Sequence, residues 1–417
     1  INLHRKNYMK RELIRITFVG DIMCERPLLK AYFMNKGYDF RPVFEATKKL
    51  FNESDFVIGN LETVFAGKEV GYTNSLYSFN TPDEFLDALK ESGIDLFLTA
   101  NNHCLDRGID GLKRTIHELD SRNMAHIGTY LNEKEQKKIF VKDIHGIKIA
   151  FLNYTYGTGI KDNHVILEKK DQDCVNLLMP QKVGSPIRYN KRKNKVSFLK
   201  RNISKLFSED TKLRIKKKLG KSVGAPRTDE LWDELIDYKL LDVLKNDIKQ
   251  AKKVADYVVL NIHNGGQFNA EPGEYSKYIM KFCVESGADV VVGNHPHVVQ
   301  KRELIDNTLC AFSLGNYSIS PSTPYMLFEN YPQYSIALHV CFDKEKVQIA
   351  ESSFSVLKIL EDSKHRLKVV DTFDWAKTIT GIEKEKLQEE VQFICEQFTC
   401  QQYHTFELKQ EYKVFGE

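Results

Sequence analysis

Short apolar runs alternate with helical segments along most of this chain, and this alternation restricts the fold more than any other feature. Runs rich in β-branched or aromatic residues, which are typical of buried strands, occupy residues 13–19, 55–59, 95–99, 125–128, 257–262, 289–292, 309–314, 334–342 and 347–356. Helical patterns occupy residues 44–51, 108–123, 240–253, 274–286 and 382–398. Strands that are separated by helices in this way predict an α/β fold.

Two local signals refine this prediction. Thr81 is followed directly by Pro82, and this pair predicts a helix that begins here with Thr81 as its N-cap and Pro82 in its first turn. His145 and Gly146 lie between two apolar runs, 138–142 and 148–154. A turn of this kind between two strand patterns predicts a β-hairpin.

Residues 161–233 break the alternation, and we interpret them as an insertion or lid. Residues 181–225 contain 15 Lys or Arg and two Asp or Glu, a local net charge of +13, so the rest of the chain carries −9. Within this basic segment, residues 189–221 have apolar positions at helical spacing, beginning with Val196 and Leu199. They could form an amphipathic helix on an anionic membrane surface, a strip that binds a polyanion, or a solvated insertion packed on the body. Nucleic acid is not an expected partner, because the segment has few aromatic residues and no known motif.

Composition bears mainly on location. No apolar run is long enough for a transmembrane helix. The eight cysteines form no C-x-x-C pair and several lie in apolar patterns, which favours buried thiols in a reducing compartment. On the present sequence we expect a protein in the cytoplasm or at the periphery of a membrane. Because the chain begins with Ile1, an anchored extracytoplasmic protein is the expectation if the N-terminus is truncated.

Polar residues suited to binding metal follow five of the predicted strands. They are Asp21, Glu62 with Asn60, Asn102 with His103, His263, and the pair His295 and His297 around Pro296. Each has an ordinary explanation when taken singly, such as a turn, a helix cap or a packed histidine. Ligands bind at the carboxyl ends of strands in open α/β sheets, so the coincidence at five strand ends favours one metal site.

The chemistry of these side chains narrows the metal. Carboxylates, amides and imidazoles without a thiolate suit Mn, Fe or Zn, and they fit hydrolysis better than a structural cysteine-rich zinc site. One carboxylate can bridge two ions about 3.5–4 Å apart, and such a pair stabilises both the attacking and the leaving oxygen of a displacement. We therefore predict one or two divalent transition-metal ions as the cofactor.

Five stretches of the sequence together resemble a known family. They are Gly20-Asp21-Ile22-Met23, Asn60-Leu61-Glu62-Thr63, Asn101-Asn102-His103-Cys104-Leu105-Asp106-Arg107-Gly108, Gly293-Asn294-His295-Pro296-His297-Val298-Val299-Gln300 and Ser313-Leu314-Gly315-Asn316. They are similar to the CapA family (PGA_cap) of bacterial capsule and poly-γ-glutamate synthesis proteins, a branch of the calcineurin-like metallophosphoesterase superfamily. The resemblance implies a four-layer αββα sandwich over residues 1–360, with the insertion inside it, and leaves residues 361–417 as a C-terminal extension of unknown role.

The resemblance also implies roles for individual residues. The implied metal ligands are Asp21, Glu62, Asn102, His263, His295 and His297, with Glu62 at the place of the bridging carboxylate. His103 is implied to contact the substrate and to protonate the leaving group. Arg107 is a candidate anchor for an anionic substrate, because a guanidinium can bind phosphate or carboxylate through two hydrogen bonds. Asp106 is expected to orient His103 or to pair with Arg107, and Asn60 and Asn316 are further candidates for substrate binding.

Two positions depart from the family pattern. The superfamily usually has a histidine where this chain has Met23, so one ligand is lost and a second ion would be held more weakly. The branch commonly has a glutamate where this chain has Gln267.

Two hypotheses for the function follow. The first is a metal-dependent hydrolase of an anionic phosphoester or amide in capsule or poly-γ-glutamate biosynthesis, with His103 as general acid. The second is a non-catalytic, metal-binding assembly or export factor of a capsule-synthesis complex. Met23 favours the second hypothesis, whereas His103 and Arg107 favour the first, because a structural site needs neither. The expected partners are an anionic substrate or polymer, the synthesis complex and a membrane surface.

Overall fold

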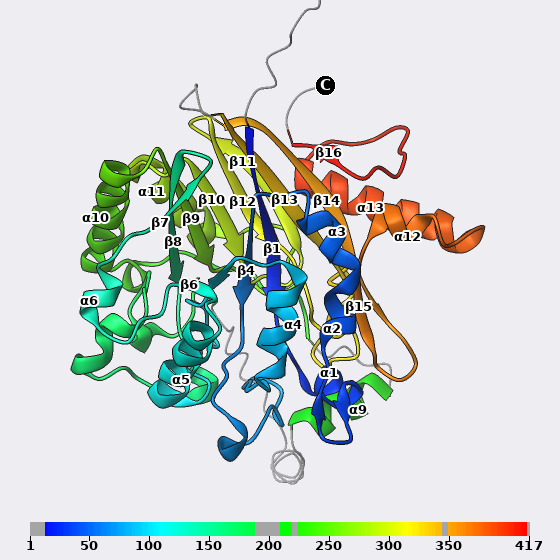
Figure 1. Cartoon of the computed structure of the whole chain (residues 1–417), viewed down its shortest axis with the longest axis horizontal. Coiled ribbons are helices and arrows are strands. Elements are labelled where there is room, and N and C mark those ends of the chain that lie inside the picture. The colour runs from blue at the N-terminus through cyan, green and yellow to red at the C-terminus, as the bar shows by residue number, and fades with distance from the viewer. Residues whose placement is uncertain (1–12, 188–208, 219–223, 344–348, 415–417) are drawn as a thin grey trace, which may run out of the picture.

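Two β-sheets stack face to face, and helices cover the outer face of each sheet (Figure 1). The computed structural model describes residues 13–187, 209–218, 224–343 and 349–414. The prediction of a four-layer α/β sandwich is confirmed. Because strands from both halves of the chain line the space between the sheets, the two halves build one common core.

The first sheet is mixed. In spatial order its strands are β15 (Leu367–Asp371), β14 (Ile349–Glu361), β13 (Tyr334–Asp343), β1 (Leu13–Ile22), β4 (Phe56–Leu61), β5 (Leu96–Leu98) and β6 (Ala125–Ile127), with β16 (Tyr412–Lys413) paired to β14. β1, β4, β5 and β6 run parallel, whereas β13, β14 and β15 form an antiparallel extension on the other side of β1. The parallel half therefore brings the carboxyl ends of β1, β4 and β5 to one edge.

The second sheet also has a parallel centre. Its strands in spatial order are β11 (Val299–Ile305), β12 (Thr308–Leu314), β10 (Val290–Asn294), β9 (Tyr257–His263), β8 (Ile147–Thr155) and β7 (Phe140–Ile144). β8, β9, β10 and β12 are parallel, and β7 and β11 are antiparallel edge strands. The predicted hairpin around His145 is confirmed as the turn between β7 and β8, where His145 and Gly146 both have positive φ.

The core between the sheets is built by alternation along the strands. Ile14, Ile16 and Phe18 of β1 face inward toward Val290 and Val292 of β10, and all of them are almost completely buried. A fully buried side chain of this size contributes roughly 1.5–3 kcal/mol relative to an exposed one. The stacking of the two sheets is thus the main apolar contact that fixes the ends of their strands relative to each other.

Helices form the two outer layers. On the first sheet lie α1 (Arg26–Ala31), α2 (Arg41–Phe44), α3 (Lys48–Phe51), α4 (Glu84–Ser92) and α5 (Gly108–Ser121). On the second lie α10 (Tyr238–Val254) and α11 (Glu274–Ser286). A short strand pair, β2 (Phe33–Met34) and β3 (Gly37–Tyr38), follows α1, and α6 (Glu133–Gln136) precedes β7.

The end of the chain completes the first sheet and its core. After β15 come α12 (Thr372–Ala376) and α13 (Ile382–Thr399), which lies on the opposite side of the molecule from α10 (Figure 1). Val391, Ile394 and Phe398 of α13 belong to the core between the sheets. The division of the chain into residues 1–360 and 361–417 stays a prediction.

One helix begins later than its sequence predicts. α4 starts at Glu84, and Asp83 occupies the N-cap position, so the prediction of Thr81 as N-cap is wrong. The Thr81 hydroxyl instead lies 2.7 Å from the hydroxyl of Thr63, and the Thr81 N–H donates to the Val64 carbonyl. Thr81 is thereby fixed to the loop that follows β4, which leaves it unable to cap a helix.

The predicted insertion has little regular structure where it is described. It contains α7 (Ile160–Asn163), α9 (Glu209–Lys218) and the short 3-10 turns Lys169–Cys174, Gln181–Val183 and Asp233–Leu235. Most of the amphipathic pattern predicted at 189–221 lies outside the described residues. In α9, Leu213 is buried and Ile215 is exposed. No helix among the described residues is long and apolar enough to cross a membrane.

Candidate metal centre

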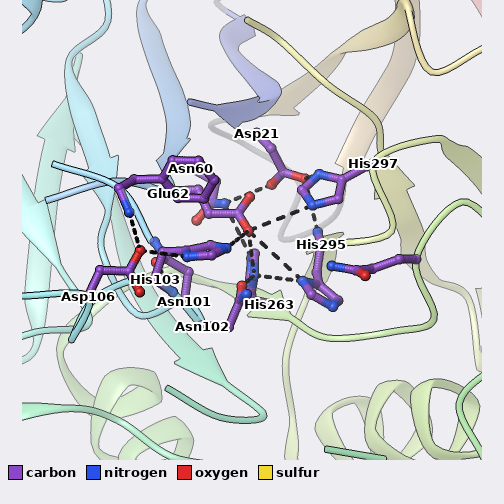
Figure 2. A network of polar contacts seen from close by, with 12 residues as sticks. Asp21, Asn60, Glu62, Asn101, Asn102, His103, Asp106, His263, His295 and His297 are labelled. Carbon is purple, nitrogen blue, oxygen red and sulfur yellow. Dashed lines mark hydrogen bonds and ion pairs between the residues drawn. The ribbon is translucent and has the colours of Figure 1, made fainter. Parts of the chain in front are cut away.

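The candidate site lies at one end of the core between the sheets, where five strands from both sheets end (Figure 2). The alternation that turns Ile58 of β4 into this core continues to Asn60 and Glu62. β9 follows the same rule, since Val259 faces the core and His263 is the last residue of the strand. The site is therefore a polar continuation of the apolar layer, and its side chains are buried for the same reason.

Asp21 reaches the site through a β-bulge in β1. Val19 and Ile22 both pack under the outer helices, although strict alternation would place them on opposite faces. The register of β1 against β4 shifts between Val19 and Asp21, and this extra residue turns Asp21 toward the site. Gly20 is required there, because a Cβ atom would lie 1.9 Å from the Gly315 carbonyl oxygen.

The two histidines after β10 have unusual backbone conformations. His295 has φ 105° and His297 has φ 59°, on either side of Pro296. Positive φ strains a residue that has a side chain, and such residues persist only where the surroundings hold them. The His295 N–H donates to Asp21 Oδ2 at 3.2 Å, so the carboxylate of one sheet helps to hold the strained turn of the other.

The buried ligand atoms form two groups of three that share one carboxylate. Glu62, His263 and His295 make one group, and Asp21, Glu62 and His297 make the other, with all ligand atoms of a group within 4.8 Å of one another. Glu62 Oε1 lies 3.4 Å from His263 Nε2 and 4.0 Å from His297 Nε2. Each group could hold a metal ion, and Glu62 would be common to both.

The Glu62 carboxylate has no hydrogen-bond partner within the described protein. Both of its oxygens are buried and unpaired, and the side chain is fully inaccessible to solvent. Burial, together with the neighbouring Asp21 carboxylate, raises the pKa of Glu62 well above its ordinary value. Burying a carboxylate without hydrogen bonds is unfavourable, and a cation between Glu62 and the surrounding imidazoles would offset this cost. The residues present thus fit a metal ion.

The charge states of the histidines and of Asp21 also suit the binding of a metal ion. Burial lowers the pKa of His263 to about 3, and burial with the neighbouring imidazoles lowers the pKa of His295 well below its ordinary value. Both rings are therefore neutral near pH 7 and keep a lone pair for a metal. Burial alone would raise the pKa of Asp21, but His297, His263 and the Asn60 amide outweigh it and lower that pKa.

Three asparagines support these ligands. Asn60 Nδ2 donates to Asp21 Oδ1 at 2.7 Å, and Asn102 Oδ1 lies 2.6 Å from His263 Nε2, where it could act as a further ligand beside Glu62. Asn316 Oδ1 lies 3.0 Å from His297 Nδ1, and its amide donates to the His297 carbonyl. Asn60 and Asn316 are almost fully buried, and both contact metal-ligand candidates directly. Their predicted contact with substrate stays a prediction.

His103 and Asp106 form a hydrogen-bonded pair beside the two groups. His103 Nδ1 lies 2.8 Å from Asp106 Oδ2, and His103 Nε2 lies 3.9 Å from Glu62 Oε1 (Figure 2). Burial lowers the pKa of His103, but Asp106 and then Glu62 outweigh it and raise that pKa above its ordinary value. The pair therefore favours the protonated form of the imidazole and leaves Nε2 on the side of Glu62.

Arg107 stands at the outer side of this pair. Its guanidinium is half-buried and donates to the Asp106 backbone carbonyl at 2.9 Å and to the Ser78 hydroxyl. It forms no ion pair within the described part of the chain. Of the two roles predicted for Asp106, the structure favours orienting His103, because the Asp106 carboxylate contacts that ring and not the guanidinium.

Both departures from the family pattern lie next to the site. Met23 is buried in an apolar cluster with Phe79, Phe268 and Val298, and it offers no nitrogen or oxygen to a metal. Gln267 is half-buried, and its Oε1 accepts a hydrogen bond of 3.4 Å from Arg227. The group that contains Asp21 thus has one ligand fewer than the superfamily pattern.

Sequence reasoning missed the aromatic rings and one backbone group around the site. Tyr156 lies 4.9 Å from the His295 ring centroid, and Phe79 lies 4.6 Å from that of His103. The Phe79 N–H also donates to Asp106 Oδ2 at 2.6 Å. A backbone donor has no residue-type signal, and both rings come from loops whose positions depend on the fold, so only the structure could reveal them.

A large groove lies away from these residues. A groove of about 1100 Å³ between α10 and residues 166–182 is lined by Tyr154, Asn176 and Asp247 among others, and by none of the residues named above. Asp247, a half-buried acid of this groove, already has a partner, because the Tyr154 hydroxyl donates to it at 2.6 Å. The buried Glu62 oxygens without hydrogen bonds lie in the ligand groups and not in this groove.

Comparisons with known proteins find similar sequences over most of the chain. A family model described as "Bacterial capsule synthesis protein PGA_cap" matches residues 15–321. The PGA biosynthesis protein CapA of Bacillus subtilis (strain 168) is 25% identical over 308 residues, which are 73% of this chain and 63% of that protein. The capsule biosynthesis protein CapA of Bacillus anthracis is 26% identical over 321 residues, 75% of this chain and 61% of that protein. The chain thus spans less than two thirds of the length of these curated relatives.

Proposed function

Because the chain belongs to the PGA_cap family of bacterial capsule synthesis proteins, we propose that it is a metal-dependent hydrolase. Its substrate would be an anionic phosphoester or amide that arises in capsule or poly-γ-glutamate biosynthesis. The observation that carries the proposal is the fully buried, unpaired Glu62 carboxylate shared by two groups of ligands. A carboxylate in this position is explained by a cation, and a hydrolase of this ligand chemistry uses that cation directly.

The metal-ligand residues would be Asp21, Glu62, Asn102, His263, His295 and His297. They fit one or two ions of Mn, Fe or Zn, because they offer oxygen and imidazole nitrogen without a thiolate. When bound, such an ion polarises the scissile group and makes water a better nucleophile at neutral pH. The neutral state of His263 and His295 keeps these ligands available at neutral pH.

His103 would be the general acid. Asp106 raises the pKa of this imidazole and fixes the ring through Nδ1, so that Nε2 would carry the proton toward the leaving group. One water is consumed: its oxygen joins the phosphorus or carbonyl carbon, the bond to the leaving group breaks, and His103 supplies the proton that this group takes up. A proton from the water restores the imidazolium.

Arg107 would bind the negative charge of the substrate. Its guanidinium contacts the backbone carbonyl of Asp106 and has no carboxylate partner within the described residues. Burial lowers its pKa, which is the sign of a cation held partly out of water. An anion at this place would be bound through charge-assisted hydrogen bonds. A site that served structure alone would need neither this cation nor the protonated imidazole.

A second function is favoured by one observation. Met23 fills an apolar cluster where the superfamily usually has a ligand, so the group around Asp21 has fewer donors. The alternative is an assembly or export factor of a capsule-synthesis complex, in which the metal only stabilises the fold. In either case we propose that the partners are an anionic polymer and, through the basic segment, a membrane surface.

Metal content and turnover test the proposal together. We expect at least one equivalent of a transition metal in the purified protein, and metal-dependent hydrolysis of a phosphodiester or of poly-γ-glutamate. Glu62→Gln should abolish both the bound metal and the hydrolysis. Glu25→Gln is a matched control, because Glu25 is also buried, outside the ligand groups, and burial raises its pKa to about 8.

The outcomes separate the two functions. Metal far below one equivalent in the wild-type protein would contradict both. Bound metal without turnover of either substrate would favour the assembly factor. Hydrolysis that survives in Glu62→Gln would show that the activity arises elsewhere in the chain.

A further inference from the structure

The short hairpin of β2 and β3 carries two apolar side chains on its outside. Phe33 is 62% exposed and Met34 is 60% exposed. Large apolar residues that are exposed singly are ordinary on a protein surface. Among the described residues, however, only these two exposed large apolar residues are adjacent in the sequence. Phe33 is paired with Tyr38 and Met34 with Gly37, and neighbouring strand residues point to opposite faces, so the end of the hairpin is apolar on both faces.

Rings beneath the hairpin hold Phe33 in its exposed position. The Phe33 ring centroid lies 5.3 Å from that of Tyr38, which stacks on Phe40 at 5.5 Å. Phe40 in turn packs edge-on against Phe85 at 5.0 Å, and both of these rings are completely buried in the core under the outer helices. Because Tyr38 and Phe40 already fill the space beneath the hairpin, the Phe33 ring stays at the surface.

Two lysines flank the apolar end of the hairpin. Lys30 lies in the last turn of α1, and Lys36 lies in the turn between β2 and β3. Both are exposed, and neither has an acidic partner in the part of the chain that the structure describes. Residues 26–41 contain four Lys or Arg and one Asp, a net charge of +3, and that Asp39 is already paired with Arg41. The surroundings of the apolar end are therefore positive and suit an anionic surface.

An apolar end with these neighbours fits a lipid surface better than a protein. A stable protein interface buries roughly 800 Å² on each partner, which two side chains on a protruding hairpin cannot supply. A fluid bilayer closes around a group that is apolar on both faces, whereas a protein would need a slot shaped for it. Lysines beside such a group can place their ammonium groups among the lipid phosphates while their stems lie along apolar surface.

We propose that the hairpin inserts Phe33 and Met34 into the interface of an anionic phospholipid bilayer, with Lys30 and Lys36 against the headgroups. The hairpin follows α1, which lies at the end of the first sheet toward which β1 runs (Figure 1). Asp21 lies at that end of β1, so docking through the hairpin would turn the strand ends that carry the metal centre toward the membrane. This inference goes beyond the proposed function, does not depend on catalysis, and concerns a contact separate from the one proposed for the basic segment.

Vesicle flotation tests the proposal. The protein is mixed with vesicles of phosphatidylcholine and phosphatidylglycerol, or of phosphatidylcholine alone. We expect the wild type to float with the anionic vesicles. Phe33→Ser combined with Met34→Ser should bind them at least about tenfold more weakly, because two apolar groups no longer leave water. Lys30→Gln combined with Lys36→Gln should weaken binding to the anionic vesicles by about fivefold for each lysine and leave any binding to the neutral ones unchanged.

A matched control comes from α10, which also carries exposed apolar side chains. Tyr238→Ser combined with Val254→Ser removes two of them away from the hairpin and should bind vesicles like the wild type. The side chains replaced in all these variants are exposed, so we expect the melting temperatures to match that of the wild type.

A fluorescent reporter shows whether the end of the hairpin enters the lipid. Phe33→Trp should give a blue-shifted emission on addition of anionic vesicles, and brominated acyl chains should quench it. The signal is the difference from the wild type, which has two tryptophans of its own. Tyr238→Trp is the control and should show neither change.

Three results would overturn the inference. The first is a wild type that floats with neither kind of vesicle, and the second is a double serine variant that binds anionic vesicles as tightly as the wild type. The third is a Phe33→Trp emission that brominated lipid does not quench. If the serine variant instead loses self-association in light scattering without lipid, the hairpin is a contact between two copies and the lipid proposal is wrong. None of these results depends on metal content or turnover, so the hydrolase proposal stands or fails separately.

Discussion

Replacing Glu62 by glutamine is expected to remove both candidate metal positions at once, because Glu62 is the one residue common to the two ligand groups. The substitution conserves shape and removes only the charge. In the metal-free protein it should have the opposite effect on stability, since the carboxylate it replaces is buried without a partner. This reversal of sign separates the loss of a ligand from general damage to the fold.

The effect of the metal on the free energy of unfolding can be calculated from its affinity for the folded protein. At a metal concentration of 100 times Kd, binding to the folded state adds about 2.7 kcal/mol to the free energy of unfolding. Even residues that only support a ligand change metal affinity by about 10- to 100-fold, so loss of the shared ligand should cost at least about 100-fold. The added stability would then fall to about 0.4 kcal/mol. With an unfolding entropy of about 2.1 cal/mol/K per residue over 417 residues, the metal should therefore raise the Tm of the wild type by about 3 °C more than the Tm of Glu62→Gln.

The effect without metal follows from the pKa of Glu62. Because burial raises this pKa, the folded protein favours the protonated carboxyl, and the stability it contributes is present at low pH and lost as pH rises. At pH 7 the glutamine variant should therefore be more stable than the metal-free wild type, by about 1–3 kcal/mol for an uncompensated buried group. The advantage should shrink as the pH approaches the ordinary pKa of a glutamate.

Differential scanning calorimetry of chelated and metal-loaded protein measures both effects. Glu25→Gln should keep the full increase of Tm on metal addition, since at pH 7 its carboxyl is already largely protonated. If Glu62→Gln gains as much Tm from metal as the wild type, the shared-ligand argument is wrong. If it is less stable than the wild type both with and without metal, contacts between the Glu62 carboxylate and the surrounding imidazoles outweigh the missing hydrogen bonds.

Three further outcomes are expected. The kcat/KM for hydrolysis should decline as pH rises through the pKa of His103. Asp106→Asn should move this decline to lower pH, because Asp106 raises that pKa. A pH–rate profile that does not shift in this variant would contradict the role of Asp106 beside His103. Arg107→Lys should raise KM about tenfold with a smaller change in kcat, since loss of one charge-assisted contact is about 1.4 kcal/mol; an unchanged KM in steady-state kinetics would count against it. Burial lowers the pKa of His339 to about 3, so the stability that the neutral ring contributes is lost as pH falls below the ordinary pKa of a histidine. In urea unfolding between pH 6 and 4, His339→Gln should reduce the change of the unfolding free energy with pH by up to about 1.4 kcal/mol per pH unit.

Much of the fold could be predicted from the sequence because periodicity reports burial directly. The helix predicted at residues 274–286 has these bounds in the structure, and the predicted strands at 257–262 and 309–314 agree within a residue or two. Strand pairing could not be predicted in this way. The five strand ends belong to two stacked sheets, and an apolar run does not reveal which sheet it joins. The strand β11 (Val299–Ile305) could not be predicted either, because the polar and charged residues in its middle give no apolar run.

The site was predictable in its chemistry and not in its arrangement. The sequence predicted that Asp21, Glu62 and the three histidines lie together, and the structure places them in two groups within reach of one another. It did not reveal that Glu62 is unpaired or that Asn316 is buried behind His297. Hydrogen bonding and depth of burial depend on every neighbouring element, so residue type alone does not carry them. The roles of these residues stay predictions.

The candidate metal ligands come from both sheets, and this affects the order in which the site can form during synthesis. Asp21, Glu62 and Asn102 lie in the first quarter of the chain, whereas His263, His295 and His297 lie in its second half. A ribosome that has made the first carboxylates has not yet made any of the three imidazoles that share them. Since domains fold as their chain emerges, with the N-terminal part first, the early segments must wait with an unneutralised pair of acids. An ion bound to both sets of ligands would therefore be taken up late, after both of these parts of the chain have been made and have packed together.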